Sequence, residues 1–309
     1  MNSLPKAEET DGAPAVEFRN VSLSFDGKAA LRDVSFTLRR GRMICVTGAS
    51  ASGKSVLLRL AAGFLKPDGG EIFVDGREIE RLSEDDLLAI RGGVMGILFQ
   101  EESVFTGMNV YDNVAYRLAE HGWSEEDTER AVREALRFVG LESDIDKLPE
   151  ELSGGMKRRL EIARAFVGWP SVMLFDEPTS GLDPLNEEQV LDLIIRARDL
   201  QTISTLFVTK QLHQIPYLAT HRAVEVEGRR VEVREAVASE ASDLSVLFLH
   251  EGEVAFFGTP AEFFANTTPA VTYMTRAQSV SHAAGPYVAD PWDRRRRKKR
   301  KTTETRVGG

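Results

Sequence analysis

Hydrophobic and polar residues alternate over the first part of the chain, as they do in half-buried β-strands. Residues 16–25 (VEFRNVSLSF) and 31–41 (LRDVSFTLRRG) flank a turn at Asp26-Gly27, and residues 71–79 (EIFVDGREI) contain a second turn at Asp75-Gly76. Asp-Gly pairs favour tight hairpin turns, because both residues adopt positive φ readily. The pattern therefore predicts short antiparallel strands at the start of the chain.

Apolar runs alternate with helical patterns further along the chain. Residues 43–47 (MICVT) lead into a glycine-rich loop and a helical pattern, which is the opening of a nucleotide-binding α/β fold. A helical stretch at 186–200 joins apolar runs at 172–177 and 204–209, so these two strands are predicted to lie parallel. The segment between about residues 109 and 166 is almost entirely helical in pattern.

The last third of the chain is predicted to hold two hairpins and a tail. Residues 224–233 form an extra hairpin about Glu227-Gly228-Arg229, residues 247–258 form a second one, and Pro260 stands where the next helix would begin. After about Arg276 the chain is punctuated by proline and glycine and then becomes basic. We therefore expect a flexible N-terminus at 1–15, a folded domain at 16–275 and a disordered tail at 276–309.

Composition excludes several classes of protein. The 309 residues are 42% hydrophobic and 28% charged, which fits a globular protein rather than a coiled-coil rod or a disordered chain. Cys45 is the single cysteine, so a disulfide framework and a cysteine-based zinc site are excluded. No stretch approaches the roughly 18 apolar residues of a membrane span, and the N-terminus lacks the apolar segment of a secretory signal. We expect a cytoplasmic chain that reaches any membrane through a partner.

Charge is distributed unevenly along the chain. The net charge is −9, but eight consecutive cations at 294–301 (RRRRKKRK) contribute +8, so the rest of the chain carries −17. An acidic body argues against a broad nucleic-acid surface on the folded domain. The basic run could contact anionic lipid headgroups or RNA, or it could remain a solvated end of the chain.

A phosphate-binding loop is the most specific motif. Residues 48–55 (GASASGKS) fit the pattern G-x-x-x-x-G-K-[ST] between an apolar strand and a helix. The glycines let backbone N–H groups turn toward the phosphates, and the helix N-terminus adds positive potential. We expect Lys54 to reach the β- and γ-phosphates and Ser55 to ligate Mg²⁺. The residues predicted to bind the nucleotide are Gly48, Ala49, Ser50, Ala51, Ser52, Gly53, Lys54, Ser55 and Val56.

Two carboxylates end the apolar run at 172–177 (VMLFDE). A parallel strand delivers such side chains to the carboxyl edge of its sheet, beside the phosphate-binding loop. Asp176 would hold Mg²⁺ through water, and Glu177 would polarise the water that attacks the γ-phosphate. The alternative is an exposed acidic turn after a core strand.

The sequence LSGGM at 152–156 precedes a helix, and a serine with two glycines at a helix N-terminus can bind an anion. With the phosphate-binding loop, Gln100, Asp176-Glu177 and SGLD at 180–183, it resembles the nucleotide-binding subunit of an ABC transporter over about residues 16–260. The resemblance implies an α/β P-loop NTPase of the ABC type, with an antiparallel β subdomain and a helical subdomain at about 101–168 inserted in a RecA-like core. It also implies an ATPase that uses ATP and Mg²⁺ and acts as a homodimer with composite sites.

The resemblance assigns roles to individual residues. Phe25 matches the position that stacks on adenine, although packing within a strand is an alternative. Gln100 matches the glutamine that senses Mg²⁺ and the γ-phosphate beside the permease. The residues implied to meet the other subunit are Ser153, Gly154 and Gly155, which would close on its bound γ-phosphate, and Asp183 at the dimer seam.

One position departs from the family pattern. A histidine normally follows the strand that here reads TLFVT, but this chain has Lys210. Lysine keeps a hydrogen-bond donor and a positive charge on a flexible stem, and its usual pKa of about 10.4 removes the option of a neutral state near pH 7. We therefore expect Lys210 to take part in catalysis with a slowed turnover. His213, three residues on, is a conceivable substitute donor, but a histidine with a surface or core role is the favoured interpretation.

The run at 103–116 (SVFTGMNVYDNVAY) and Met156 make the chain similar to the ATPase of Mla/MCE-type phospholipid transporters. This implies a subunit on the cytoplasmic face of the inner membrane that binds an integral membrane permease around Gln100–Tyr116. An MCE-type substrate-binding protein would be an indirect partner. The alternatives are the ATPase of an amino-acid or multidrug ABC transporter and, from another class, a soluble ABC-type regulator that binds nucleic acid or the ribosome.

Overall fold

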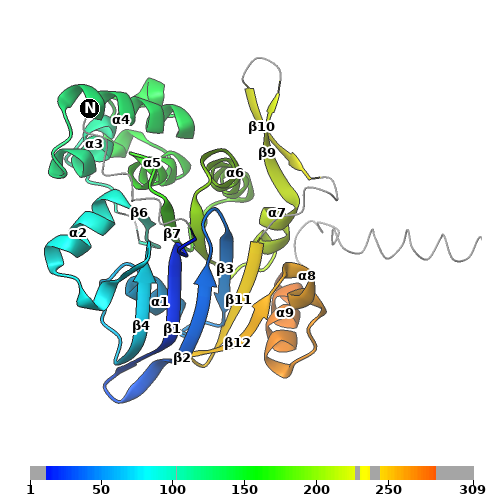
Figure 1. The fold of residues 1–309 in the computed structure, drawn as a ribbon. Helices are drawn as coiled ribbons and strands as arrows, with labels where there is room; N and C mark the ends of the chain where they lie inside the picture. The colour runs from blue at the N-terminus through cyan, green and yellow to red at the C-terminus, as the bar shows by residue number, and fades with distance from the viewer. Residues whose placement is uncertain (1–11, 102, 227–229, 237–243, 283–309) are drawn as a thin grey trace, which may run out of the picture.

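The computed structural model describes residues 12–101, 103–226, 230–236 and 244–282, and a six-stranded sheet lies at its centre (Figure 1). Neighbouring strands from β11 to β6 are parallel, and β12 at the edge runs antiparallel. The predicted parallel pairing of the runs at 172–177 and 204–209 is therefore confirmed. The strands, in spatial order, are β12 (Glu253–Gly258), β11 (Leu244–His250), β3 (Met43–Gly48), β8 (Ser204–Val208), β7 (Val172–Asp176) and β6 (Met95–Leu98).

A second sheet contains the antiparallel strands predicted at the start of the chain. Its order is β2 (Lys28–Leu38), β1 (Val16–Phe25), β4 (Gly69–Val74) and β5 (Arg77–Glu78). Phe18 lies opposite Phe36, and the two rings stack with 4.7 Å between their centroids. Asp26 and Asp75 have φ of 49° and 54°, and each is followed by a glycine with positive φ. The two predicted Asp-Gly turns are therefore confirmed.

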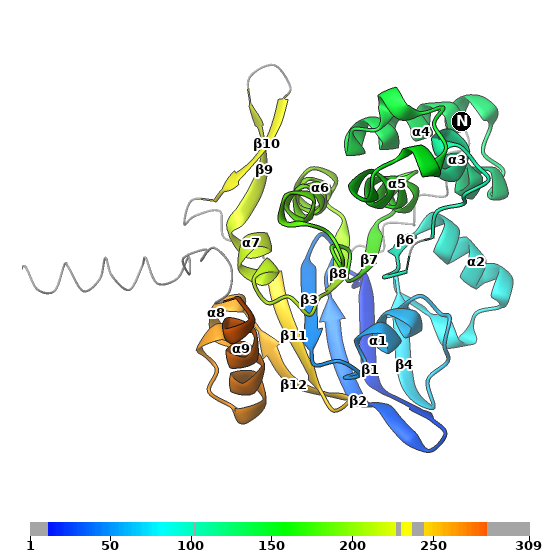
Figure 2. The same cartoon turned by 180° about the vertical axis from the view of Figure 1, so that it is seen from behind.

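Successive residues of the central strands point to opposite faces of the six-stranded sheet, and each face has its own core. Ile44 and Val46 of β3 pack in the cluster that holds the antiparallel sheet and α1 (Lys54–Ala61). Met43 and Cys45 pack in the cluster that holds α5 (Gly154–Phe166) and α6 (Pro184–Gln201). Burial on both faces explains why this strand is a continuous apolar run in the sequence. Figure 2 shows α5 and α6 in the upper half of the molecule, with the antiparallel sheet below them.

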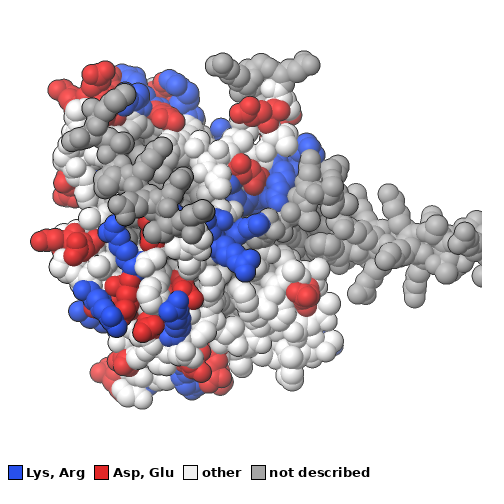
Figure 3. Space-filling view, in the orientation of Figure 1, with Lys and Arg blue, Asp and Glu red and all other residues white. Residues whose placement is uncertain are grey.

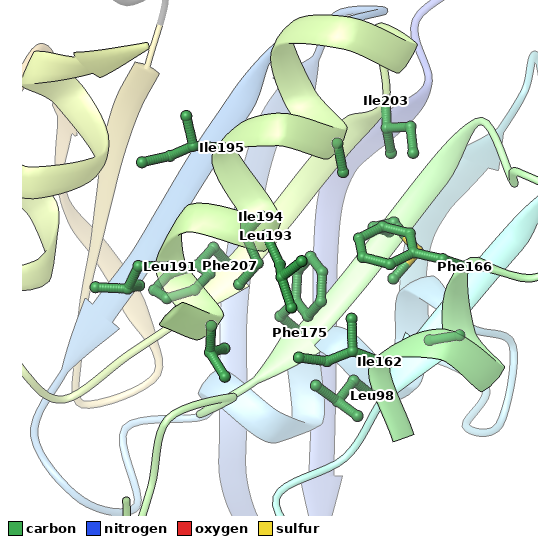
Figure 4. Close-up of a cluster of buried hydrophobic side chains, with 14 of the residues drawn as sticks. Leu98, Ile162, Phe166, Phe175, Leu191, Leu193, Ile194, Ile195, Ile203 and Phe207 are labelled. Atoms are coloured by element: carbon green, nitrogen blue, oxygen red, sulfur yellow. The ribbon is translucent and has the colours of Figure 1, made fainter. Parts of the chain in front are cut away.

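The segment that was predicted to be helical lies between β6 and β7 in the sequence and forms a layer of helices. It contains α3 (Val110–Glu120), α4 (Glu125–Val139) and α5, with short 3-10 turns at Glu142–Asp144 and Pro149–Glu151. Figure 4 shows how this layer meets the sheet, where Phe166 of α5 packs on Phe175 of β7 with 6.0 Å between ring centroids. A further helix, α2 (Glu84–Gly93), follows a 3-10 turn at Ile79–Arg81 and was not expected from the sequence pattern.

The expected extra hairpin is present beside α6. After α7 (Gln214–Thr220), strands β9 (His221–Val226) and β10 (Arg230–Glu235) pair antiparallel, and their predicted turn at 227–229 lies outside the described residues. Arg198 of α6 donates hydrogen bonds to the carbonyl oxygens of Leu218 and His221 at 2.6 and 2.8 Å. The base of the hairpin is therefore attached to α6.

Both predicted ends of the folded domain are wrong by a few residues. Ala15, which was expected in the flexible N-terminus, is buried, and its N–H donates to the carbonyl oxygen of Leu38 at 2.9 Å. At the other end, α8 (Pro260–Ala265) begins at the predicted proline, and α9 (Pro269–His282) continues past the expected boundary at 276. No proline or glycine interrupts the sequence inside α9, so the helix has no reason to stop there. The basic run at 294–301 lies outside the described residues.

Candidate nucleotide site

The loop between β3 and α1 has a backbone that accepts only glycine at two positions. Gly48 has φ of 153°, and a Cβ there would lie 2.2 Å from the carbonyl oxygen of Leu249. Gly53 has φ of 103°, and a Cβ there would lie 2.7 Å from the carbonyl oxygen of Ala30. A glycine-containing loop of this kind, at the N-terminus of a helix, can present backbone N–H groups to a phosphate. The predicted residues 48–56 therefore lie together on one loop and the first turn of α1.

Lys54 is buried beneath this loop, with 5% of its surface exposed. Its Nζ donates hydrogen bonds to the carbonyl oxygens of Gly48 at 2.9 Å and Ala49 at 2.7 Å. Burial and then the charge of Lys210 lower the pKa of Lys54 to about 8, while nearby carboxylates oppose the shift. Neutral carbonyl oxygens bind an ammonium group less strongly than a phosphate does. Lys54 is therefore placed to exchange them for a bound nucleotide.

Asp176 offers a metal-binding oxygen at the end of β7. The residue is 5% exposed, and its Oδ1 atom is buried without a hydrogen-bond partner. Burial raises the pKa of the Asp176 carboxyl group, and a hydrogen bond from the Ser55 side chain opposes that shift. The described residues contain no group of three or more His, Cys, Asp and Glu that could hold a metal alone. Mg²⁺ commonly binds one or two carboxylates together with substrate phosphates, so Asp176 and Ser55 fit it.

Glu177 follows Asp176 in a left-handed backbone conformation, with φ of 47°. Its N–H donates to the carbonyl oxygen of Val208 at 3.0 Å, and its own carbonyl oxygen accepts from Nη2 of Arg158 at 3.2 Å. Its carboxylate Oε1 lies 2.7 Å from Nζ of Lys210, and only 11% of the Glu177 side chain is exposed. The alternative of an exposed acidic turn is therefore wrong for Glu177.

The structure brings Lys210, and not His213, to the Glu177 carboxylate. Nε2 of His213 lies 2.6 Å from Oε1 of Glu187 on α6. The buried Gln214 next to it donates to the hydroxyl of Thr179 and to Glu187 at 2.6 and 2.8 Å. The residues after β8 therefore pair with two different acids, and Lys210 is the one that reaches the predicted general base.

The predicted signature residues open α5 in the way that a ligand-binding helix start would. Ser153 is the N-cap, and its side chain accepts a hydrogen bond from the N–H of Met156 at 3.3 Å. A Cβ on Gly154 would meet no atom within 4 Å, whereas a Cβ on Gly155 would lie 2.1 Å from Oδ1 of Asn186. Gly154 therefore faces open space, and Gly155 allows α5 to approach α6.

Asp183, which was predicted at a dimer seam, caps α6 in the single chain. Its Oδ1 accepts hydrogen bonds from the N–H groups of Leu185 and Asn186 at 3.1 Å each. Its Oδ2 accepts from the side-chain amide of Asn186 at 2.6 Å, and these bonds hold its pKa below the usual range. Asn186 thus connects Asp183 to the signature glycine Gly155.

The signature helix and the phosphate-loop helix lie on opposite faces of the six-stranded sheet. Leu57 and Leu60 of α1 belong to the cluster below the sheet, whereas Leu160 and Ile162 of α5 belong to the cluster above it. The sheet therefore separates Ser153 and Gly154 from the phosphate-binding loop of the same chain.

The remaining predicted residues lie near the edge of the site. Phe25 is 46% exposed at the end of β1, opposite Lys28. The same hairpin continues to Ala30, whose carbonyl oxygen approaches Gly53, so the hairpin that carries Phe25 contacts the phosphate-binding loop. Gln100 is exposed and is the second residue after the end of β6.

Sequence reasoning missed two buried charged residues, Arg158 and Glu161 of α5. As whole residues they are 7% and 3% exposed, and Nη1 of Arg158 lies 2.7 Å from Oε2 of Glu161. Their spacing of three residues on a predicted helix was the available signal, but that spacing is equally typical of solvated surface pairs. Burial of the pair depends on the loops that pack over it, which are distant in the sequence.

Comparisons with known proteins agree with this geometry. A family model described as ABC transporter matches residues 31–180. The methionine import ATP-binding protein MetN of Leifsonia xyli subsp. xyli is 38% identical over 223 residues, which are 71% of this chain and 65% of the relative. This chain therefore spans slightly less than two thirds of that relative.

Two other proteins extend the comparison. The chloroplastic protein TRIGALACTOSYLDIACYLGLYCEROL 3 of Arabidopsis thaliana is 33% identical over 271 residues, which are 85% of this chain and 74% of the relative. The solved structure of cbiO1 from Clostridium perfringens, described as part of the ABC transporter complex cbiONQ, is 26% identical with a TM-score of 0.69. The match covers 82% of this chain and 91% of that one.

Proposed function

Because this chain belongs to the ATP-binding family of ABC transporters, we propose that it binds and hydrolyses MgATP to energise a membrane permease. The observation that carries the proposal is the unpartnered buried Oδ1 of Asp176 beside Ser55, on the sheet edge where the phosphate-binding loop starts. A buried acceptor with no partner is rare in folded proteins unless it serves a ligand. Ser55 and Asp176, with Gln100 on the next loop, would hold Mg²⁺, which neutralises charge on the β- and γ-phosphate oxygens.

The protein groups around the γ-phosphate divide the chemistry between them. Glu177 would accept a proton from the attacking water as the water oxygen bonds to the γ-phosphorus and the bond to the bridging oxygen breaks, releasing ADP and phosphate. Lys54 would contribute positive charge to the phosphate oxygens. Lys210 would leave Glu177 for the γ-phosphate when ATP is bound, because a phosphate carries more negative charge than one carboxylate.

The complete site would contain two copies of the chain. Gly154 faces open space, and the sheet separates it from the phosphate-binding loop of its own chain. A second copy would therefore supply Ser153, Gly154 and Gly155 to the γ-phosphate. Asp183 would lie at the seam between the copies, and the exposed Phe25 would stack on adenine.

A permease contact near the loop after β6 is supported by exposed aromatic side chains. Phe105 and Tyr116 are 37% and 40% exposed, their ring centroids are 5.1 Å apart, and Arg164 lies over the Phe105 ring at 4.4 Å. Exposed aromatic and arginine side chains are typical of protein interfaces. In the part of the chain that the structure describes, no helix has the length and apolar character needed to cross a bilayer.

For the cargo, the comparisons favour amino-acid import, which was the alternative to phospholipid transport in the sequence analysis. The relative from Leifsonia xyli is a methionine import protein, and its 38% identity supports a permease for an amino acid. Lipid transport is a second candidate because the Arabidopsis relative, whose name contains that of a galactolipid, aligns with a larger share of this chain. A nucleic-acid-binding regulator is less favoured, since Figure 3 shows acidic and basic side chains interspersed over the antiparallel sheet.

The full-length chain tests the nucleotide proposal directly. Glu177→Gln should bind MgATP, fail to hydrolyse it, and elute as a dimer, whereas Glu126→Gln, an exposed acid on α4, should behave as the wild type. Normal hydrolysis by Glu177→Gln would overturn the assignment of the general base. The membrane protein that copurifies with the trapped variant then decides the cargo. An amino-acid permease supports the first candidate, and a permease that copurifies with an MCE-domain protein supports the second.

A further inference from the structure

The buried pair of Arg158 and Glu161 connects α5 to two loops of the nucleotide site. The side chains are 8% and 2% exposed, so neither charge is solvated by bulk water. A buried charge that is not fully paired is strongly unfavourable, and its hydrogen bonds therefore identify the groups that the pair holds.

The Arg158 guanidinium donates to three carbonyl oxygens outside its helix. Nε donates to Pro178 at 2.5 Å, Nη2 to Glu177 at 3.2 Å and Nη1 to Phe99 at 3.1 Å. The first two belong to the loop of the general base, and Phe99 directly precedes Gln100. One planar side chain therefore connects both loops, which a single-point donor such as lysine could not do in the same geometry.

Glu161 holds the other side of the Gln100 loop. Its Oε1 accepts a hydrogen bond from the N–H of Ser103 at 2.6 Å, while its Oε2 pairs with Arg158. The chain on either side of Gln100 is thus attached to the same turn of α5, at Phe99 and at Ser103.

We propose that Arg158 and Glu161 are positioning residues that fix Glu177 and the Gln100 loop to the signature helix; this inference rests on the proposed ATPase function. Glu177 needs such support because its left-handed φ of 47° is unfavourable for a residue with a Cβ. Its N–H donates to the carbonyl oxygen of Val208, and its own carbonyl oxygen accepts from the N–H of Ser180 at 3.0 Å and from Arg158. Removing the guanidinium takes away one of the two hydrogen bonds to that carbonyl oxygen and the only side-chain link from α5 to Pro178 among the described hydrogen bonds. The loop is then less restrained, and the carboxylate moves more easily relative to the γ-phosphate.

The double substitution Arg158→Gln with Glu161→Gln tests the proposal, because it removes both charges and leaves no lone charge buried. The expected result is a fall of at least tenfold in kcat with the Kd for a non-hydrolysable ATP analogue unchanged within twofold. The matched control is Arg159→Gln on the same helix, whose Nη1 bonds the carbonyl oxygen of Val139 in α4 at 3.2 Å. It should lower the melting temperature and leave kcat at the wild-type value.

Further outcomes distinguish a positioning role from a purely structural one. If the double variant does not fold, Arg158→Lys keeps the positive charge but cannot reach all three carbonyl oxygens, and it should lose several-fold in kcat at normal ATP affinity. A folded double variant with wild-type kcat, or Arg158→Lys with wild-type kcat, overturns the inference. Failure of the wild-type chain to bind ATP contradicts the proposed function instead.

Discussion

The ion pair between Lys210 and Glu177 predicts a measurable coupling between the two residues in ATP binding. Nζ of Lys210 lies 2.7 Å from Oε1 of Glu177, and the two side chains are 40% and 11% exposed. Because the lysine is more than a third exposed, solvent screening limits the pair to about 0.5–1 kcal/mol. If Lys210 transfers to the γ-phosphate, ATP binding must first break this pair.

Substituting Glu177→Gln releases Lys210 and should raise the affinity for a non-hydrolysable ATP analogue. Loss of the Glu177 negative charge also raises ATP affinity by itself, because it removes repulsion of the phosphates. The same Glu177→Gln substitution is therefore made in a Lys210→Gln background, where the charge is lost in the same way but there is no ion pair to break. The ratio of the two effects should be roughly two- to fivefold, which corresponds to about 0.5–1 kcal/mol. For ADP, which has no γ-phosphate, the ratio should be close to one.

Equilibrium titration of the four variants with both nucleotides measures this ratio. An equal effect of Glu177→Gln in both backgrounds would refute the transfer of Lys210 to the γ-phosphate. The Lys210→His variant tests the same ion pair by its rate of ATP turnover. A histidine can be neutral near pH 7 and would then not hold Glu177 in an ion pair. It should raise ATP turnover, and an unchanged or lower rate would contradict the expectation that Lys210 slows the wild-type chain.

Two further predictions concern the phosphate site. Gly154→Ala should leave the melting temperature unchanged, because the added Cβ meets no atom of its own chain within 4 Å. It should lower ATPase activity at least tenfold, because Gly154 is proposed to meet the nucleotide of the partner. Gly155→Ala displaces Asn186 and should lower both the melting temperature and the activity. Equal melting temperatures and equal activities for the two variants would contradict the conclusion that Gly154 faces a partner whereas Gly155 packs against Asn186 of its own chain. The pKa of Lys54 in the free chain is about 8, so above that pH the lysine is mostly neutral. It must regain a proton to bind phosphate, and the affinity for the ATP analogue should therefore fall by up to tenfold per pH unit above about pH 8. A flat profile from pH 8 to 9.5, an interval that spans ~1.5 pH units, would contradict it.

The features that sequence predicted well depend on residues close together in the chain. The phosphate-binding loop is defined by backbone conformations at Gly48 and Gly53, which no other residue type adopts as readily. The strand at 43–47 is covered on both faces and therefore has an unbroken apolar pattern. Such local requirements leave a direct trace in the sequence.

The features that sequence missed depend on contacts between distant residues. Arg158 reaches Phe99 and Pro178, which lie 59 and 20 residues away, and nothing in a helical pattern indicates those contacts. Helix α2 was missed for a different reason, since its signal was local: Ser83 and Asp86 form a complete capping box. The mixed apolar and acidic sequence after that box gave no strong periodicity.

The signature helix α5 would contact both nucleotide sites of the proposed dimer. In the proposed dimer, Gly154 at the start of α5 meets the ATP that is bound to the partner. Arg158 lies four residues further along the same helix, about 6 Å in axial rise, and holds the carbonyl oxygen of Glu177, which acts on the ATP of its own chain. A helix transmits displacement along its axis with little loss, because its backbone hydrogen bonds keep one turn rigid relative to the next. Contact of Gly154 with one nucleotide would therefore shift the general base at the other, and the Arg158 and Glu161 variants should uncouple the two sites without preventing nucleotide binding.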